Sequence, residues 1–477
     1  MPEASFNRPE GYARAVGVYE GLPARALKAG AQYCDVRVER RFGLSLEFKD
    51  GEPREAVPGD EQGLCVRVLY KGAWGLASTN DMSRPGVERT FSWALRIARA
   101  KSGLQRAADA VRLAPAGAGK VGICWKVARN PHDVSVEAKS AYLLELSRAA
   151  RSVPGVKTVT AFYADGTRSS HFVSSEGADV RTEVTRSLSD VSVVVKTDRG
   201  LLGNRARVGG TAGWEIHEKG GLAQKGVEAA RTALALLNGD KAPSGRFPVV
   251  ADPDLAGVFA HEAVGHAAEG DLIVAGDSCL EGRLGQRIGS RLVTLVDDPT
   301  IPGAFGSFPY DDEGVPARRK VLIDKGVFTG YILDRESARR LRAAPNGAAR
   351  AESYGARPLV RMSNTLIEAG GHSHEEIFEG IKFGIYAKGT RGGQVDTAKG
   401  SFQFACREAY MIEKGEVTRP LRSLALSGGI LHTLREVVAV GKDRQVADPG
   451  YCGKGQTVPV GDGGPHIRIR SAAVGGG

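Results

Sequence analysis

The stretch Phe259-Ala-His-Glu-Ala-Val-Gly-His-Ala-Ala-Glu-Gly-Asp271 decides how this chain is organised. It places two imidazoles, His261 and His266, five residues apart, with the carboxylate of Glu262 directly after the first. A zinc hydrolase needs neutral nitrogen or thiolate ligands, an open position for water, and a nearby carboxylate that takes the proton of that water. The alternative interpretation is two unrelated surface histidines on a helix, with Glu262 simply solvated.

The five-residue spacing of the two histidines predicts a distorted helix. At 3.6 residues per turn, residues four apart lie about 40° apart around a helix, and residues five apart lie about 140° apart. The common HExxH zinc motif uses the shorter spacing. An HExxxH pair therefore converges on one ion only if the helix kinks or widens to an i→i+5 turn. We expect Gly265, just before the second histidine, to permit this distortion.

Length and composition are those of an ordinary soluble protein. The chain has 477 residues, of which 42% are hydrophobic and 25% charged, so we expect two or three domains. No run approaches the roughly 18–20 consecutive apolar residues of a membrane span, so no membrane association is expected. Residues 1–30 lack the apolar core of a signal peptide, so we expect no export.

The cysteines and the net charge argue against a disulfide-bonded protein and against a nucleic-acid-binding protein. The six cysteines are Cys34, Cys65, Cys124, Cys279, Cys406 and Cys452. Their irregular spacing favours reduced thiols in a cytoplasmic protein over a disulfide framework. The net charge of +10 comes from Lys and Arg spread among Asp and Glu along the whole chain. Without a basic block or an aromatic-basic motif, we expect no direct nucleic-acid binding.

Periodicity divides the chain into three segments, residues 9–103, 104–240 and 241–477. In the first we expect helices at 12–29 and 87–100 and strands at 34–40, 44–48, 63–69 and 74–77. In the second we expect helices at 138–153 and 217–237 and strands at 158–163, 169–175, 178–187 and 191–196. These patterns predict an α+β fold whose N-terminal α/β layers contain an antiparallel sheet.

The third segment begins with a short apolar strand at 246–250. Asp252 or Asp254 then caps the helix that carries the HExxxH motif. Beyond Asp271 the chain is rich in glycine and strand-forming residues, with hairpins around Lys325-Gly326 and Lys414-Gly415. We expect these strands to curl into a barrel-like sheet, so that a Gly-rich β-barrel-like domain carries the kinked helix.

Two further histidines are given structural roles. His217-Glu218 has no second histidine at a useful distance, so we interpret it as part of the surface. His171 lies in a predicted strand and is expected to have an ordinary hydrogen-bond partner. Neither is a candidate ligand.

Two histidines leave a zinc site incomplete, so a third ligand is required. The candidates are Cys279, Cys406, Cys452, the pair His372 and His374, His432 and His466. Ser373 with Glu376 forms a capping box beside the histidine pair, and Cys406 lies in an alternating strand where a buried thiol is expected. Cys452 lies between glycines on a predicted loop, with Lys454 near enough to favour its ionisation. Spacing alone does not connect positions 266 and 452.

The motif resembles the TldD branch of the TldD/PmbA metalloproteases, once called modulators of DNA gyrase. The similarity begins with His261-Glu-Ala-Val-Gly-His266 and Glu269-Gly-Asp271. It continues through Val296-Asp-Asp298, Asp311-Asp-Glu-Gly314, Glu352-Ser-Tyr354, Gly392-Gly-Gln-Val-Asp396 and Cys452-Gly-Lys454. It covers residues 245–475 and is weaker around Cys34. Many relatives are expected to have an extra residue between Lys454 and Gln456.

The resemblance implies a site and a reaction. His261, His266 and Cys452 would be the ligands of one zinc ion per active subunit, and Glu262 would activate the zinc-bound water. The PmbA (or TldE) branch lacks HExxxH, so the intact motif indicates the active branch. The implied activity is hydrolysis of peptide bonds in small or unfolded polypeptides inside a dimer cavity. The dimer is a homodimer or a heterodimer with a PmbA/TldE-like paralogue.

Two other function classes remain open at this stage. One is a noncatalytic regulatory or binding protein, in keeping with the gyrase-modulator label, which predicts no bound zinc. The other is a zinc hydrolase that acts on a non-peptide amide.

Overall fold

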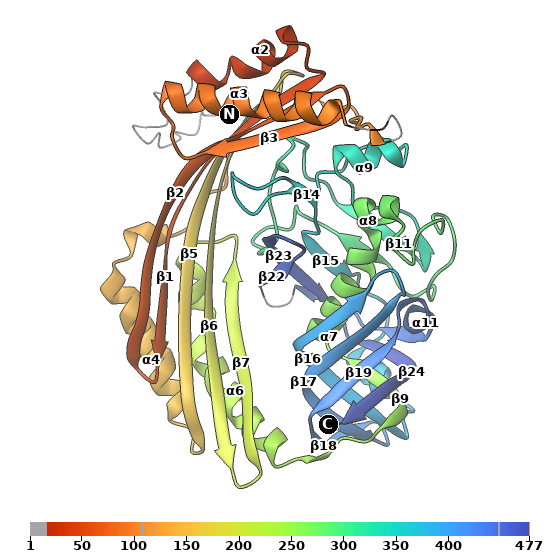
Figure 1. The fold of residues 1–477 in the computed structure, drawn as a ribbon. Helices are drawn as coiled ribbons and strands as arrows, with labels where there is room; N and C mark the ends of the chain where they lie inside the picture. Colours follow the sequence, from red (N-terminus) through yellow and green to blue (C-terminus); the bar gives the residue numbers. More distant parts are fainter. Residues whose placement is uncertain (1–16, 105, 107–108, 118, 447–448, 477) are drawn as a thin grey trace.

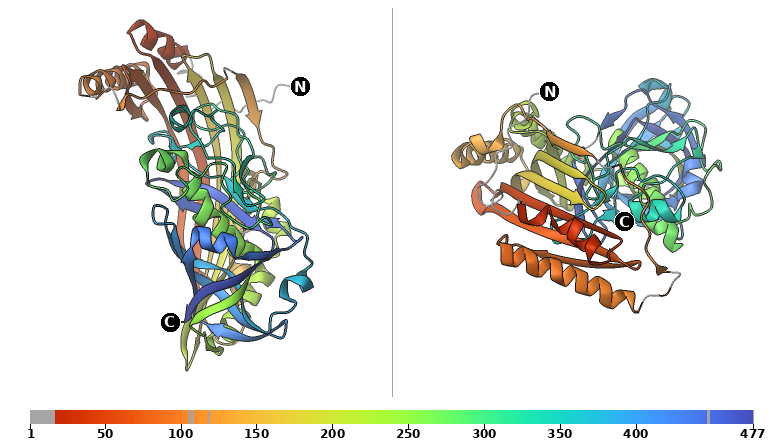
Figure 2. Two further views of the ribbon diagram at one scale, coloured as in Figure 1. Left: turned by 90° about the vertical axis from the view of Figure 1, so that its right-hand side faces the viewer. Right: turned by 90° about the horizontal axis from the view of Figure 1, so that it is seen from above.

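The computed structural model of this protein describes residues 17–104, 106, 109–117, 119–446 and 449–476. Figure 1 shows a tall N-terminal sheet with helices on its outer side, facing a C-terminal unit coloured green to blue. The two views of Figure 2 show the same division. The predicted α+β fold is confirmed. Residues 12–16 of the first predicted helix lie outside the described residues.

The N-terminal sheet has seven strands and spans both of the first two predicted segments. Its strands are β1 (Tyr33–Lys49), β2 (Glu52–Tyr70), β3 (Ala73–Thr79), β4 (Lys120–Cys124), β5 (Val156–Ser174), β6 (Asp179–Thr197) and β7 (Gly200–Gly210). Their order is β3-β2-β1-β5-β6-β4, and β7 also pairs with β6. The antiparallel pairing of β1 with β5, in which Arg41 lies opposite Arg168, joins the two segments into one sheet.

The strands are longer than expected. The predicted strands 34–40 and 44–48 form the single 17-residue strand β1, and the four predicted strands of the middle segment form only β5 and β6. The charged residues in the middle of β1 have partners: Arg40 pairs with Asp60, and Arg41 pairs with Glu39. Ion pairs across the strand surface therefore allow the chain to continue extended.

Helices cover the outer side of this sheet. Two of them, α2 (Leu22–Lys28) and α3 (Arg84–Ser102), pack at its upper end, and Ser83 caps α3 by accepting the backbone N–H of Gly86. Lower down, α4 (Val136–Arg151) and α6 (Leu222–Leu237) bury a second apolar cluster against β5 and β6. None of the described helices is both long and apolar enough to cross a membrane.

The predicted helix 217–237 is two helices, and its first histidine is not at the surface. The break comes at Gly220-Gly221, between α5 (Glu215–Lys219) and α6, where Gly221 has a φ of +60°. His217 is only 3% exposed, and its ring lies against those of Trp214, Tyr163 and Tyr142. The surface prediction for His217 is therefore wrong, because these aromatic side chains enclose it.

His171 does have ordinary partners. Its ring nitrogens lie 2.7 Å from the hydroxyl of Tyr19 and 2.8 Å from Oδ1 of Asp179. The expected structural role is confirmed.

The C-terminal unit contains a closed barrel, as predicted. Its strands are β9 (Gly245–Ala251), β16 (Phe383–Asp396), β17 (Ser401–Glu413), β19 (Leu424–Gly429) and β24 (Ile467–Gly476). They pair in the order β16-β9-β24-β19-β17, and the additional pairing of β16 with β17 closes the ring. Outside the ring, β18 (Glu416–Arg422) pairs with both β17 and β8 (Asp240–Lys241), and β20 (Val437–Val440) pairs with β24.

A second C-terminal sheet connects this barrel to the N-terminal sheet. Its strands are β10 (Leu295–Asp297), β11 (Lys320–Asp324), β12 (Val327–Phe328), β15 (Asn364–Ile367), β21 (Gln445–Val446), β22 (Gly450–Gly453) and β23 (Thr457–Gly464). Besides the helix that carries the two histidines, the unit has four short helices and a two-stranded sheet. These are α8 (Gly270–Ala275), α9 (Arg335–Arg340), α10 (His374–Phe378), α11 (Ile430–Arg435), β13 (Ala349–Arg350) and β14 (Leu359–Val360). The β22–β23 hairpin lies between the barrel and the N-terminal sheet (Figure 1).

Candidate metal centre

The helix that carries the two histidines starts conventionally and then widens. Asp252 caps α7 (Pro253–Phe259) by accepting the backbone N–H of Leu255 at 2.8 Å. The chain then forms a π-helical segment, η3 (Ala260–Gly265), followed by a 3-10 turn, η4 (His266–Ala268). A π turn aligns residues five apart. The predicted i→i+5 distortion is confirmed, and the rings of His261 and His266 lie 5.2 Å apart and perpendicular.

Gly265 is needed for a different reason from the one expected. Its φ of −54° and ψ of −57° are ordinary helical values that any residue adopts. A Cβ at this position would lie only 2.1 Å from Sδ of the buried Met362. Space for close packing, rather than backbone freedom, therefore requires glycine here.

The hairpin of β22 and β23 brings Cys452 to the two histidines. In that hairpin Cys452 lies opposite Val458, and its Sγ is 3.2 Å from Nε2 of His266. One donor atom from each of His261, His266 and Cys452 lies within 4.8 Å of the other two. All three residues are buried, with exposures of 4%, 9% and 6%.

The other candidate ligands lie elsewhere. His372 contacts the carbonyl of Val440, His432 contacts Arg246, and His466 contacts Asp443 and Tyr386. His374 is the first residue of α10, which Ser373 and Glu376 open with the predicted capping box. Cys406 is a buried thiol of β17, as expected, and the backbone N–H of Cys279 donates to the carbonyl of Thr397. No other group of three metal-binding side chains forms in the described part of the chain.

Two imidazoles, and not Lys454, favour the thiolate. Burial on its own raises the pKa of Cys452, but hydrogen bonds and positive charge from His261 and His266 outweigh burial and lower the pKa to about 4. The expectation that Lys454 ionises the thiol is wrong. Its Nζ lies 2.7 Å from both carboxylate oxygens of Asp271 and 3.2 Å from Glu269. Cys452 also lies in a strand rather than on a loop.

A buried carboxylate orients the second histidine. Glu269 is fully buried, and its Oε2 lies 2.9 Å from Nδ1 of His266, which leaves Nε2 directed at Cys452. Burial lowers the pKa of His266. The charge of Glu269, together with hydrogen bonds from His266 to Cys452 and Glu269, outweighs burial and raises this pKa to about 10. Carboxylates commonly fix metal-binding histidines in this way. The motif spacing does not reveal this role of Glu269, although its position three residues after His266 is a usable signal.

The hairpin itself is held by a buried arginine. The guanidinium of Arg361 donates to the carbonyl oxygens of Cys452 at 2.5 Å and Gln456 at 2.6 Å. Arg361 thereby holds β22 and the turn residue that precedes β23. The thiol consequently approaches the histidines from a rigid support.

The residues present fit a divalent metal. Two imidazoles and a readily ionised thiol are the nitrogen and sulfur donors that zinc prefers. Nδ1 of His261 is buried and has no hydrogen-bond partner among the described residues, so the protein alone does not satisfy this cluster. Glu262 extends to the open side, with 31% of its side chain exposed and Oε2 3.9 Å from Nε2 of His266.

Family models match all three parts of the chain. The PmbA/TldA metallopeptidase C-terminal domain matches residues 244–476, domain 1 matches residues 34–98, and the central domain matches residues 129–237. The first match contains the whole histidine and cysteine cluster.

Curated relatives match over nearly their full length. A metalloprotease of Methanothermobacter thermautotrophicus is 43% identical, and the alignment covers 96% of this chain and 98% of the relative. A metalloprotease TldD homolog of Haemophilus influenzae is 34% identical over 93% of each chain. A zinc metalloprotease TldD homolog of Saccharolobus solfataricus is 29% identical over 95% of this chain and 98% of the relative.

Solved structures share the fold. A putative modulator of a DNA gyrase from Thermotoga maritima has a TM-score of 0.79 at 20% identity, covering 96% of this chain and all of the other. TldE from Thermococcus kodakarensis has a TM-score of 0.76 at 21% identity, covering 96% of this chain and 99% of the other. With family models along the chain and full-length relatives above 30% identity, this chain belongs to the PmbA/TldD family and is a metalloprotease of the TldD type.

Proposed function

We propose that this chain is a zinc-dependent peptidase, with His261, His266 and Cys452 as the zinc ligands and Glu262 as the general base. The buried His, His and Cys cluster on the π turn, with an accessible carboxylate beside it, is the observation that carries the proposal. Zinc bound there would lower the pKa of the attacking water and polarise the scissile carbonyl.

Each protein group then has a defined task. Glu262 takes a proton from the attacking water and passes it to the leaving amine. Because Glu262 follows a ligand directly in the π turn, the same backbone that positions His261 positions the base. Glu269 holds the ring of His266 through Nδ1, and Arg361 holds the hairpin of Cys452.

We further propose that the substrates are small or unfolded polypeptides, and that each active subunit holds one zinc ion. An extended peptide can bind by adding a strand to the edge of a sheet, which favours unfolded substrates. A subunit pair, either a homodimer or a heterodimer with a TldE-like paralogue, is supported by the fold shared with TldE. We place the reaction in the cytoplasm, in keeping with six cysteines that are all unpaired.

The test combines metal analysis with cleavage of an unfolded polypeptide. We expect wild-type protein to contain zinc and to cleave, and Glu262→Gln to keep the zinc but to cleave roughly 10²–10⁴-fold more slowly. Unchanged cleavage by Glu262→Gln would overturn the assignment of the base. Zinc-free protein without cleavage would instead favour a noncatalytic binding protein.

A further inference from the structure

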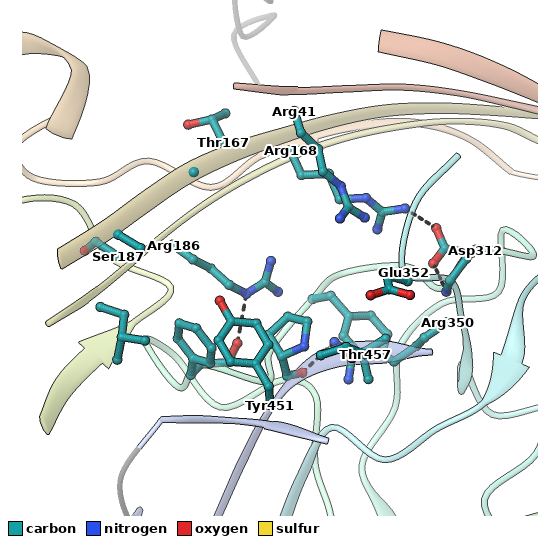
Figure 3. Close-up of a pocket in the computed structure, with 18 of the residues that line it drawn as sticks. Arg41, Thr167, Arg168, Arg186, Ser187, Asp312, Arg350, Glu352, Tyr451 and Thr457 are labelled. Carbon is teal, nitrogen blue, oxygen red and sulfur yellow. Dashed lines mark hydrogen bonds and ion pairs between the residues drawn. The ribbon is translucent and has the colours of Figure 1, made fainter. Parts of the chain in front are cut away.

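A cavity of about 310 Å³ lies between the N-terminal sheet and the C-terminal unit, on the other side of the β22–β23 hairpin from the metal centre. Consecutive side chains of a strand point to opposite faces. In β22, Cys452 therefore faces the histidines, whereas the neighbouring Tyr451 faces this cavity (Figure 3). Thr457 and Pro459 of the paired strand line it as well.

Arginines from three neighbouring strands reach into the cavity from one face of the N-terminal sheet. Arg41 of β1 lies opposite Arg168 of β5, and Gly166, two residues before Arg168, lies opposite Arg186 of β6. Residues paired across strands share a face, so all three guanidiniums point the same way (Figure 3). Arg350 joins them from the C-terminal side.

Two of these guanidiniums lack a carboxylate partner. Arg186 donates only to the carbonyl oxygens of Phe305 at 2.8 Å and Ser307 at 2.6 Å, and Arg350 donates to those of Met362 and Pro459. No ion pair to either arginine forms within the described ranges of the chain. Burial, followed by neighbouring guanidiniums, lowers the pKa of Arg186 to about 10 and that of Arg350 to about 9.

Of the four carboxylates that line the cavity, three are already engaged by other groups of the protein. Asp312 pairs with Arg168 at 2.6 Å, and Asp165 pairs with Lys139 at 2.7 Å. Asp311 accepts backbone N–H groups of Glu313, Val315 and Ala349. Glu352 is exposed. Arg186 and Arg350 thus lack a carboxylate partner in a wall whose other two arginines, Arg41 and Arg168, are paired with carboxylates.

Aromatic side chains form another part of the wall. Tyr451 is 58% exposed and lies edge-on against Phe305, with ring centroids 5.3 Å apart. Phe308 lies under the guanidinium of Arg350 at 4.8 Å. An uncompensated guanidinium beside exposed aromatic surface suits a ligand with a carboxylate and an adjoining apolar side chain.

We propose that this cavity binds the C-terminal carboxylate of a short peptide, and that Arg186 is the residue that recognises it. The choice of a peptide as ligand rests on the proposed function. The side chain next to the carboxylate packs on Tyr451 and Phe305. A peptide held there lies against the hairpin that carries Cys452.

The test measures binding of the tripeptide Ala-Ala-Phe, as the free acid and as the C-terminal amide, by calorimetry. The protein is the full chain with Glu262→Gln, so that the ligand stays intact. We expect the acid to bind roughly tenfold or more tightly than the amide. When Arg186→Gln is added to that protein, its affinity for the acid should fall to its affinity for the amide.

Arg207→Gln is the matched control. Arg207 lies on the adjacent strand β7, pairs with Asp190 and donates to the carbonyl of Pro449, so it also ties the sheet to the C-terminal unit. It does not line the cavity, so the preference for the acid should survive. Loss of that preference in Arg207→Gln would show that anchoring of the two units, and not recognition by Arg186, controls it, and would overturn the proposal.

Three further outcomes separate this proposal from the proposed function. Equal affinity for acid and amide overturns the carboxylate site, even if wild-type protein cleaves peptides. Binding of acetate as tight as that of the tripeptide overturns the peptide assignment. A preference for the acid that depends on Arg186, in a protein that cleaves nothing, supports the site while the proposed function fails.

Discussion

Two of the His-Glu dipeptides in this chain, His217-Glu218 and His261-Glu262, place their histidines in opposite environments. His217 of α5 is buried among Trp214, Tyr163 and Tyr142, and burial lowers its pKa to about 4. His261, and His266 beside it, are equally buried but face the thiol of Cys452 and the carboxylate of Glu269. The pKa of His266 rises to about 10. Burial is common to both regions. The anionic partners that the fold brings to the second region make the difference.

The largest expected difference between the two regions is in metal binding. Cys452→Ala removes the only sulfur of the cluster, so we expect zinc content to fall from about one ion per chain to near zero, with loss of peptide cleavage. Cys406→Ala, at an equally buried cysteine of the barrel, should keep its zinc. Elemental analysis after gel filtration measures both. Full zinc content in the Cys452 variant would contradict the assigned ligand set.

A smaller effect is expected from the carboxylate behind the metal centre. Glu269→Gln keeps the shape of the side chain but removes the charge that faces His266 and Lys454. We expect zinc affinity to fall roughly 10–100-fold, as for other residues that orient metal ligands. Competition with a coloured chelator gives the affinity. Glu376→Gln, at the exposed capping box of α10, is the control and should leave it unchanged.

The aromatic region should respond to pH instead. The pKa of His217 falls from the ordinary 6.5 to about 4 in the folded chain, so the unfolded chain takes up its proton first as the pH drops. The contribution of neutral His217 to the free energy of unfolding is therefore complete above about pH 6.5 and is lost as the pH falls toward 4. From pH 7 to pH 5 the loss is about 2 kcal/mol.

His217→Gln should remove this contribution. Urea unfolding at pH 7 and pH 5 is the measurement, and the variant should lose about 2 kcal/mol less than wild type over this interval. The same loss in both proteins would show that His217 does not carry the acid sensitivity. His374→Gln, at an exposed helix start, serves as the control.

The smallest expected effect tests the packing of the π turn. Gly265→Ala brings a methyl group against Sδ of Met362, at the flexible end of a side chain, and should destabilise the fold by roughly 1–2 kcal/mol. Because the expected cause is this contact, the double variant Gly265→Ala, Met362→Ala should lose less stability than the two single variants lose in sum. Urea unfolding of both single variants and the double variant checks this, and strict additivity would exclude the contact as the cause.

Local patterns predicted the parts of the site that lie close in sequence. The spacing of His261 and His266 predicts the widened turn, and Asp252 was one of two named caps. The approach of Cys452 depends on a hairpin and on the sheet that holds it, which no spacing encodes. Resemblance to a family supplied that residue, and tertiary structure supplies its distance to His266.

The long N-terminal strands show where pattern analysis fails. The patterns at 34–40 and 44–48, and at 158–163 and 169–175, predicted separate strands, but β1 and β5 continue without a break through Arg41 and Arg168. Asp60 of β2 pairs with Arg40, Asp312 of the C-terminal unit pairs with Arg168, and Glu39 of the same strand pairs with Arg41. A sheet stabilised by distant partners cannot be recognised from a window of neighbouring residues.

The turn between β22 and β23 has a consequence for the family as a whole. Gly455, with a φ of +66°, closes this turn, and the N–H of Lys454 donates to the carbonyl of Gln456. A shift of the β22 register by one residue would turn the phenol ring of Tyr451 toward the histidines and the thiol of Cys452 away from them. Insertions in relatives are therefore tolerable only where the turn absorbs them, and a length change within β22 itself should mark members that have lost the metal.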